Sequence, residues 1–132
     1  MLPAIENFCK IMGKERFRKE FEFENIKFET LEYLRGRTFD NSIVIGEEFQ
    51  NCTTEQLIMF VTRLGEKSKA IVNGDSAQSD LYNDDWEFRT DLDYVINRVQ
   101  KCNLENFAAV KMTESDIVRN PLIGPFLKAM KK

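Results

Sequence analysis

The first part of the chain has apolar residues at helical spacing. Ile5, Phe8 and Met12 lie three and four residues apart and are followed by Gly13. That spacing puts the three side chains on one face of a helix, and glycine commonly follows a last helical turn. Residues 14–23 are mostly charged but contain two phenylalanines four positions apart, which predicts a second, short helix.

Short apolar runs further along the chain predict strands. Residues 25–29 alternate between polar and apolar side chains, which is the pattern of a strand with one covered face. Residues 42–45 and 70–72 are continuous apolar runs rich in β-branched side chains, as in parallel strands covered on both faces. Between these runs, Thr53 or Thr54 can begin a helix that continues to about residue 64.

The remaining part of the chain predicts three helices and one more strand. Thr90 begins an expected helix that runs through residue 100, and residues 107–112 are typical of a third strand in the same sheet. A short helix is expected just before Arg119. A last helix is expected over 122–130, interrupted by its glycine and its proline.

The order of these elements indicates an α/β fold. A strand, a helix and a second strand in succession form a βαβ unit, whose strands are parallel and whose crossover is right-handed. We therefore expect a three-layer α/β domain with a mostly parallel sheet, in one unit that spans residues 1–132. The chain has 132 residues, of which 42% are hydrophobic, and this is enough for a core of its own.

Nothing in the sequence suggests a membrane segment. A membrane span needs about 18 consecutive apolar residues, and the chain has no such run. Its first ten residues already contain Glu6 and Asn7, unlike the apolar region of a signal peptide. We expect a soluble, cytoplasmic protein with no membrane partner.

The absence of histidine narrows the chemistry most. The chain contains no histidine, which excludes Ser-His-Asp triads, Cys-His dyads and imidazole metal ligands. Cys9, Cys52 and Cys102 lie 43 and 50 residues apart and form no C-x-x-C pair, so we expect reduced thiols. Carboxylates, arginines, amides and hydroxyls remain as the groups that can carry chemistry.

The charge of the chain is mildly acidic, and it is unevenly distributed. A formal charge of −3 argues against a protein that binds nucleic acid through its overall net charge. Residues 75–93 hold seven acids and one arginine, which is more typical of a solvated loop than of a metal cage. Single arginines can still act on a ligand, because a ligand responds most to nearby charges.

Polar residues follow both continuous apolar runs. Glu47 and Glu48 come directly after the first run, and Asn73, Gly74 and Asp75 follow the second. In open α/β sheets, ligands bind beyond the carboxyl ends of the strands. An apolar strand followed by two acids is also the general form of the magnesium and water site in nucleotide hydrolases. The alternative is an ordinary exposed pair of glutamates after a strand.

Five segments carry a family resemblance. They are YLRGRTF (33–39), IGEEFQN (45–51), TEQLIMFVTRLG (54–65), KAIVNGDSAQSDL (69–81) and DIVRNPL (116–122). In this order and at this spacing the segments resemble the PhoH proteins. The similarity is dense from about Leu31 to Leu81 and returns near Asp116.

The resemblance implies a P-loop ATPase core that is related to helicases of superfamily one and is often assembled as a ring. By the same resemblance, Glu48 is the catalytic carboxylate and Glu47 is the acid on the magnesium side. Gly74, Asp75 and Gln78 form the sensor loop, in which Gln78 reports the γ-phosphate.

The resemblance also assigns roles to cationic residues. Arg119, with Arg63 as a second candidate, contacts phosphate in the same or a neighbouring subunit, as an arginine finger does. Arg35, Arg37 and Thr38 stand just before the central strand and face phosphate or nucleic acid. The alternative for Arg35, Arg37 and Arg63 is a surface salt bridge.

Two features depart from the family pattern. The family has Asp where this chain has Glu47, and the extra methylene shifts the carboxylate relative to a metal. The phosphate-binding motif G-x-x-x-x-G-K-[ST] is also missing. The one Gly-Lys pair, Gly13-Lys14, has Phe8 in place of the first glycine and Glu15 in place of Ser or Thr. The chain thus resembles the C-terminal half of the ATPase core, without the half that carries this motif.

Three interpretations stay open: one half of a split protein, a truncated or decayed remnant, or a binding module that has lost catalysis. Under the first interpretation, the chain binds Mg²⁺ and ATP only with a P-loop-bearing partner and is inactive alone. The ATP hydrolysis of the complex is then expected to be linked to RNA or DNA. The alternative is an inactive PhoH-like remnant that serves in oligomerisation, protein binding or nucleic-acid binding. In both cases, unpaired strand edges predict a homo- or hetero-oligomer.

Overall fold

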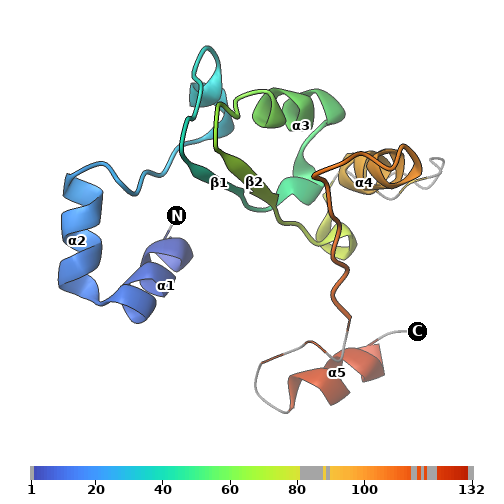
Figure 1. The fold of residues 1–132 in the computed structure, drawn as a ribbon. Coiled ribbons are helices and arrows are strands. Elements are labelled where there is room, and N and C mark those ends of the chain that lie inside the picture. The colour runs from blue at the N-terminus through green and yellow to red at the C-terminus, as the bar shows by residue number, and fades with distance from the viewer. Residues whose placement is uncertain are drawn as a thin grey trace.

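A computed structural model describes residues 2–80, 88, 90–113, 116, 118 and 122–130. Figure 1 shows two short strands at the centre, a helical hairpin to one side of them, and the last helix apart from the rest. The elements are α1 (Leu2–Met12), α2 (Lys14–Glu22), β1 (Ile43–Gly46), α3 (Thr54–Val61), β2 (Lys69–Val72), α4 (Asp91–Lys101) and α5 (Ile123–Met130), with the 3-10 turns η1 (Leu31–Leu34), η2 (Phe49–Asn51) and η3 (Ser76–Gln78).

The two strands form a parallel pair. Ile43 pairs with Lys69 and Gly46 with Val72, and a separate parallel bridge joins Phe39 to Leu64. Helix α3 connects the strands, so the predicted strand-helix-strand unit with a parallel sheet is confirmed. Helices around a small parallel sheet are consistent with a partial α/β fold of the P-loop type.

Helix α3 is stabilised both by its N-terminal cap and by the burial of its apolar face. The Thr53 hydroxyl accepts a hydrogen bond from the backbone N–H of Gln56, and the Gln56 side chain accepts one from the N–H of Thr53. This reciprocal arrangement satisfies two backbone donors that the first helical turn leaves open. Leu57 and Phe60 then point into the core, where Phe60 packs edge-on against Phe49 with ring centroids 4.8 Å apart.

The hydrophobic core lies on one side of the sheet. It is formed by η1, η2, α3 and α4 and contains Leu34, Phe49, Cys52, Leu57, Phe60 and Leu92. On the opposite face, Ile43, Ile45 and Ile71 remain 69%, 50% and 53% exposed. The prediction that both faces of the strands are covered is therefore wrong for the described part of the chain, because all of its core-forming elements pack on the same face.

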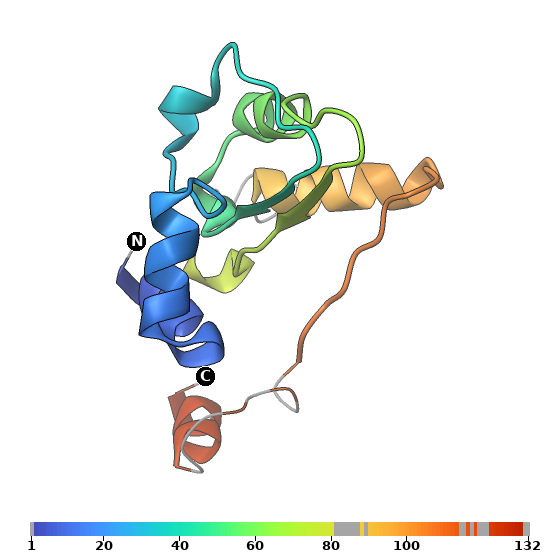
Figure 2. The ribbon, with the colours of Figure 1, turned by 60° about the vertical axis from the view of Figure 1, so that its left-hand side comes forward.

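Helices α1 and α2 pack on each other as a hairpin (Figure 2). Gly13 joins them with a φ of 85°, which a residue without a Cβ adopts easily. The predicted strand over residues 25–29 is absent: this segment has no strand assignment, and the N–H groups of Asn25 and Ile26 bond to the carbonyl of Glu20. The backbone there completes the end of α2 and does not pair with the sheet.

The predicted third strand over residues 107–112 is also absent. The segment is extended but unpaired in the described structure (Figure 1). Asn103 and Asn106 just before it have left-handed φ values of 47° and 66°, and the chain leaves α4 without reaching the free edge of β2. A strand needs a neighbouring edge for its hydrogen bonds, and apolar composition alone does not supply one.

Helix α5 differs from its prediction in one respect. It runs from Ile123 to Met130 without the expected interruption. Pro125 is the third residue of this helix, where a backbone N–H has no helical acceptor, so the proline removes no hydrogen bond. Among the described residues, no helix is long and apolar enough to cross a membrane.

Candidate functional site

The carboxyl end of β1 is shaped by a sharp bend at Glu48. Glu48 has φ 60° and ψ 33°, a left-handed conformation that is uncommon for a residue with a side chain. The bend carries the chain into η2 and turns Phe49 back into the core beside Gly46, where a Cβ would collide with the Phe49 ring. Glu47 and Glu48 are thereby left at the surface directly beyond the strand.

The carboxyl end of β2 lies beside the same bend. The N–H of Phe49 donates to the carbonyl of Asn73 at 3.0 Å, and the N–H of Asn73 donates to the carbonyl of Gly46 at 2.8 Å. These two bonds continue the pairing of the strands past their ends. The polar residues that follow β1 and β2 are therefore held together, as the sequence predicts for parallel strands.

The predicted sensor loop after β2 (residues 74–78) has an internal set of hydrogen bonds. Asp75 accepts from the backbone N–H of Ala77 at 2.9 Å and from the side-chain amide of Gln78 at 2.7 Å. Its neighbour Ser76 donates to Asp93, at the start of α4, at 2.7 Å. The structure thus brings Asp75 and Gln78 together in one short turn and ties that turn to α4.

Each glutamate of the pair after β1 accepts a hydrogen bond from a side-chain amide. Asn73 donates to Glu47 at 3.0 Å, and Gln50 donates to Glu48 at 2.7 Å. Both carboxylates are exposed. The amides hold them in place while each carboxylate keeps lone pairs that can accept a further partner.

Gln50 is a site residue that the sequence did not single out. It is only 2% exposed, and its side chain bonds to Glu48 on one strand end and to the backbone N–H of Asp75 on the other. A signal was available, because Gln50 stands in η2 between Phe49 and Cys52, which are both buried. A glutamine between buried apolar residues needs partners for its amide.

The end of the acid-rich stretch forms the start of helix α4 and is not a solvated loop. Thr90 is buried, and its hydroxyl accepts from the N–H of Asp93 as the N-cap of α4. Asp91 accepts from both the N–H and the hydroxyl of Thr54 at the start of α3. These two aspartates stand in the first turn of α4, where the helix dipole favours negative charge. The acids of residues 84–87 lie outside the described residues.

Four of the predicted phosphate-facing residues lie at the other end of the strands. Arg35, Arg37 and Thr38 precede β1, and Arg63 follows α3, next to the bridge between Phe39 and Leu64. The four-residue strands between the two ends span about 10 Å or more at about 3.3 Å per residue. Within one chain, the structure therefore separates these residues from the carboxylates.

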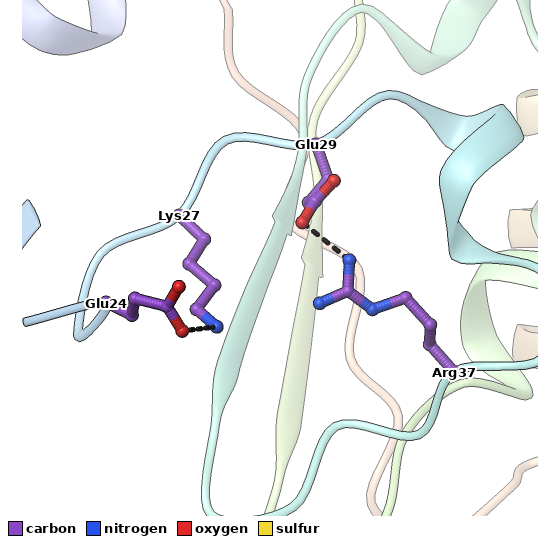
Figure 3. A network of polar contacts seen from close by, with 4 residues as sticks. All are labelled: Glu24, Lys27, Glu29 and Arg37. Atoms are coloured by element: carbon purple, nitrogen blue, oxygen red, sulfur yellow. Dashed lines mark hydrogen bonds and ion pairs between the residues drawn. The ribbon is translucent and has the colours of Figure 1, made fainter.

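Two of the arginines at that end, Arg37 and Arg63, make contacts within the chain. Figure 3 shows Arg37 reaching Glu29, with Nη1 and Oε1 2.5 Å apart, and the nearby pair Lys27–Glu24 at 2.7 Å. The ammonium of Lys27 holds the pKa of the Glu24 carboxyl below its ordinary value, first through the hydrogen bond. Arg63 donates to the carbonyl of Met59 at 3.3 Å. For Arg37, the salt-bridge alternative describes what the structure shows.

A shallow hollow of about 400 Å³ lies beside these ion pairs. It is lined by Phe21, Glu22, Glu24, Ile26, Lys27, Phe28, Glu29 and Arg37. Its charged groups include both members of the two ion pairs, so it offers no uncompensated cation for a phosphate. The remaining arginine prediction, Arg119, lies outside the described residues.

The donor set at the strand ends suits a magnesium ion only in part. Mg²⁺ prefers oxygen ligands and commonly takes one or two carboxylates, with substrate phosphates and water completing its octahedron. Glu47 and Glu48 can supply that carboxylate share. In the described part of the chain, no group of three or more acidic or sulfur ligands could hold a metal by itself. Glu47 and Glu48 could therefore supply only part of the coordination shell of a magnesium ion.

The helical hairpin confirms that Gly13-Lys14 is not a phosphate-binding loop. A P-loop places its glycines and lysine between a strand and the start of a helix. Here Gly13 instead joins α1 to α2, and no side chain caps the start of α2. None of the described elements is a strand followed by a glycine-rich phosphate loop.

Comparison with known proteins gives consistent matches. The sequence profile of one family, described as PhoH-like protein, matches residues 1–131. A "PhoH-like protein" of Bacillus subtilis is 31% identical over 130 residues, which is 98% of this chain and 39% of that protein. A "PhoH-like protein" of Synechocystis is 34% identical over 130 residues, 98% of this chain and 38% of that protein.

A third relative matches a shorter region more closely. "Protein PhoH" of Escherichia coli K12 is 50% identical over 60 residues, which is 46% of this chain and 17% of that protein. The chain therefore spans less than two fifths of the length of the curated relatives that match nearly all of it.

Proposed function

Because the chain belongs to the PhoH-like protein family, we propose that it supplies the acid and sensor half of an ATP-hydrolysing core whose phosphate-binding loop comes from a partner chain. The observation that carries the proposal is the junction of the two strand ends. There Glu47 and Glu48 follow β1, and Asp75 and Gln78 follow β2, side by side at one edge of a parallel sheet.

Each of these residues has a role that its chemistry supports. Glu48 orients and deprotonates the attacking water, which is the work of a general base near the γ-phosphate. Glu47 holds the magnesium side, and a bound Mg²⁺ would neutralise charge on the β- and γ-phosphates. Gln78, on the adjacent loop, donates to the γ-phosphate once that phosphate displaces its bond to Asp75.

The cationic residues act between chains in this proposal. Arg119 stabilises charge on the transferred phosphoryl group in the same or a neighbouring subunit, and Arg63 is the second candidate. Arg35, Arg37 and Thr38 stand at the opposite end of the strands from Glu48. A role for them with phosphate or with RNA or DNA is therefore a role toward a neighbouring subunit or a nucleic acid strand.

The need for a partner is supported by the uncovered face of the sheet. Ile43, Ile45 and Ile71 form an apolar surface that none of the described helices covers. Both outer edges of the two-stranded sheet are also unpaired among the described residues. A P-loop unit that adds strands and a helix would cover this surface and complete the third layer.

The test is reconstitution with a P-loop-bearing polypeptide from a PhoH-like relative, followed by phosphate release from Mg²⁺-ATP. We expect turnover from the mixture and none from this chain alone. Glu48→Gln should lower kcat by about 100-fold or more, because a general base contributes about 10²–10⁴-fold, and should leave nucleotide binding intact. Glu55→Gln, an exposed change on α3, is the matched control.

Two results would contradict the proposal. Normal turnover by the Glu48→Gln mixture would remove Glu48 from the chemistry. Tight binding of Mg²⁺-ATP by the isolated chain in calorimetry would show that no partner is needed for the phosphate site.

A second candidate is an inactive PhoH-like module for oligomerisation, protein binding or nucleic-acid binding. The observation that favours it is the amount of exposed apolar surface, which includes Ile43 and Ile45 on the sheet and Phe126 and Met130 on α5. Sedimentation of the isolated chain separates the two. Self-association or nucleic-acid binding without any response to a P-loop partner would favour the module.

A further inference from the structure

We propose that Gln50 is a positioning residue that links Glu48 to the sensor loop, so that a change at either strand end is felt at the other. The inference deepens the proposed function and rests on it for its catalytic consequence. The linkage itself is a property of this chain and can be tested without any nucleotide.

The first support is the way in which the Gln50 side chain divides its amide. Its Nε2 donates to Oε2 of Glu48 at 2.7 Å, and its Oε1 accepts from the backbone N–H of Asp75 at 3.1 Å. One planar amide therefore bridges the two strand ends. Because the two halves of an amide are fixed relative to each other, a shift of the Glu48 carboxylate moves the acceptor of the Asp75 N–H.

The second support is the confinement of Gln50. The residue is only 2% exposed, so an unpaired side-chain amide costs more free energy here than at an exposed position. Its backbone carbonyl accepts from the Ser79 hydroxyl at 3.1 Å, so the sensor loop is attached to it at a second point. Gln50 cannot turn away to water when one of its partners moves.

The third support is the fit of Gly74 against Gln50. A Cβ at position 74 would lie 2.8 Å from the backbone N of Gln50 and 2.9 Å from its Oε1. The sensor loop thus approaches Gln50 more closely than any residue with a side chain allows. The loop is therefore packed against Gln50 as well as hydrogen-bonded to it.

The neighbouring pair provides an internal control. Glu47 accepts a side-chain hydrogen bond of 3.0 Å from Asn73, and this bond involves neither Gln50 nor Asp75. Glu47 and Glu48 are adjacent and both exposed, yet of these two only Glu48 is joined to the sensor loop through a buried side chain. A change at Glu47 should therefore stay local.

The test is amide hydrogen exchange by NMR on the full chain. In Gln50→Met, which keeps the length of the side chain and removes both bonds, the Asp75 amide should exchange about two- to tenfold faster, as expected for the loss of one ordinary hydrogen bond. Glu48→Ala should also speed exchange at Asp75, and it should add nothing in the Gln50→Met background. Glu47→Ala and the exposed control Gln100→Met should leave the Asp75 amide unchanged.

Unchanged exchange at Asp75 in Gln50→Met would overturn the proposal. An effect of Glu48→Ala that persists at full size without Gln50 would overturn it as well. Should Gln50→Met fail to fold, Gln50→Leu replaces it, because this variant also removes both bonds and keeps an apolar side chain in the buried position. The Asp75 amide should again exchange faster than in the parent chain, and Glu48→Ala should add nothing in this background.

The catalytic consequence has a separate readout. In the reconstituted mixture, Gln50→Met should lower kcat for ATP at least tenfold with KM within twofold, because Glu48 is misaligned and the phosphate site is intact. If the mixture has no activity at all, the proposed function fails while the exchange experiment still decides the linkage. A KM effect alone would show that Gln50 serves binding and not the position of Glu48.

Discussion

The central unit (residues 43–101) and the C-terminal arm (the described residues of 103–130) use apolar residues in opposite ways. In the central unit, Leu57 and Phe60 are each 3% exposed. In the arm, Phe107 and Val110 are 52% and 87% exposed. The residue types are equally apolar in both regions. Burial here depends on whether caps, turns and a facing element place a side chain against others, and hydropathy alone does not decide it.

The same contrast runs through the polar groups. At the strand ends of the central unit, amides and carboxylates are joined by side-chain bonds between residues 25 and 26 positions apart, Asp75 to Gln50 and Asn73 to Glu47. In the arm, the N–H and the hydroxyl of Thr113 both donate to the carboxylate of Asp116, only three positions away. Long-range pairing thus marks the part of the chain that folds as a unit.

The largest expected effect is the loss of a core side chain from α3. Leu57→Ala should lower the free energy of unfolding by about 2–5 kcal/mol, because it removes buried methyl groups and leaves a cavity. The neighbouring Ile58 is 57% exposed and is the matched control, with an expected change within about 0.5 kcal/mol for Ile58→Ala. Urea unfolding followed by circular dichroism measures both. Equal effects would mean that α3 does not pack as described.

A smaller effect is expected from adding one methyl group where the strand ends meet. Gly74→Ala should cost about 1–3 kcal/mol, because its Cβ would lie 2.8 Å from the backbone N of Gln50 and from a methyl group of Leu92. Gly124 in the arm has nothing within 4 Å of such a Cβ, so Gly124→Ala should leave the unfolding midpoint unchanged. A harmless Gly74→Ala would show that the sensor loop lies further from Gln50.

The smallest effect concerns thiol reactivity and leaves stability unchanged. Burial raises the pKa of the Cys52 thiol above its ordinary value. At the same pH, Cys52 therefore carries less thiolate than a cysteine with an ordinary pKa. Cys102, at the end of α4, is exposed. With iodoacetamide at pH 8, Cys102 should react first and Cys52 only after denaturation, as peptide mass spectrometry can follow. Rapid labelling of Cys52 in the native chain would place it outside the core.

The sequence predicted those elements whose local and tertiary signals agree. The structure confirms the two strands that begin near residues 43 and 70. It also confirms the capped helix that begins after Thr53 and the helix that begins after Thr90. The three cysteines are unpaired, as expected. In each of these helices the capping residue, the apolar spacing and a facing core coincide.

The two wrong strand predictions share one cause. Residues 25–29 and 107–112 have the composition of strands, but a strand also needs an edge to pair with, and no pattern within the segment reports whether one is near. The meeting of Glu48 and Asp75 was predictable, because parallel strands end at the same edge. The bridge through Gln50 was not, because it depends on the bend at Glu48, and nothing in the sequence around a glutamate predicts a left-handed φ.

The left-handed bend at Glu48 affects which substitutions the chain tolerates at that position. A left-handed conformation costs a residue with a side chain about 1–2 kcal/mol, and glycine at position 48 would avoid most of this cost. Random substitution under selection for stability alone would therefore favour glycine there. A glutamate at φ 60° is the less stable choice for the fold. Glu24 and Lys67 adopt similar φ values of 58° and 55°, so the same pressure toward glycine acts at these three positions of the described chain.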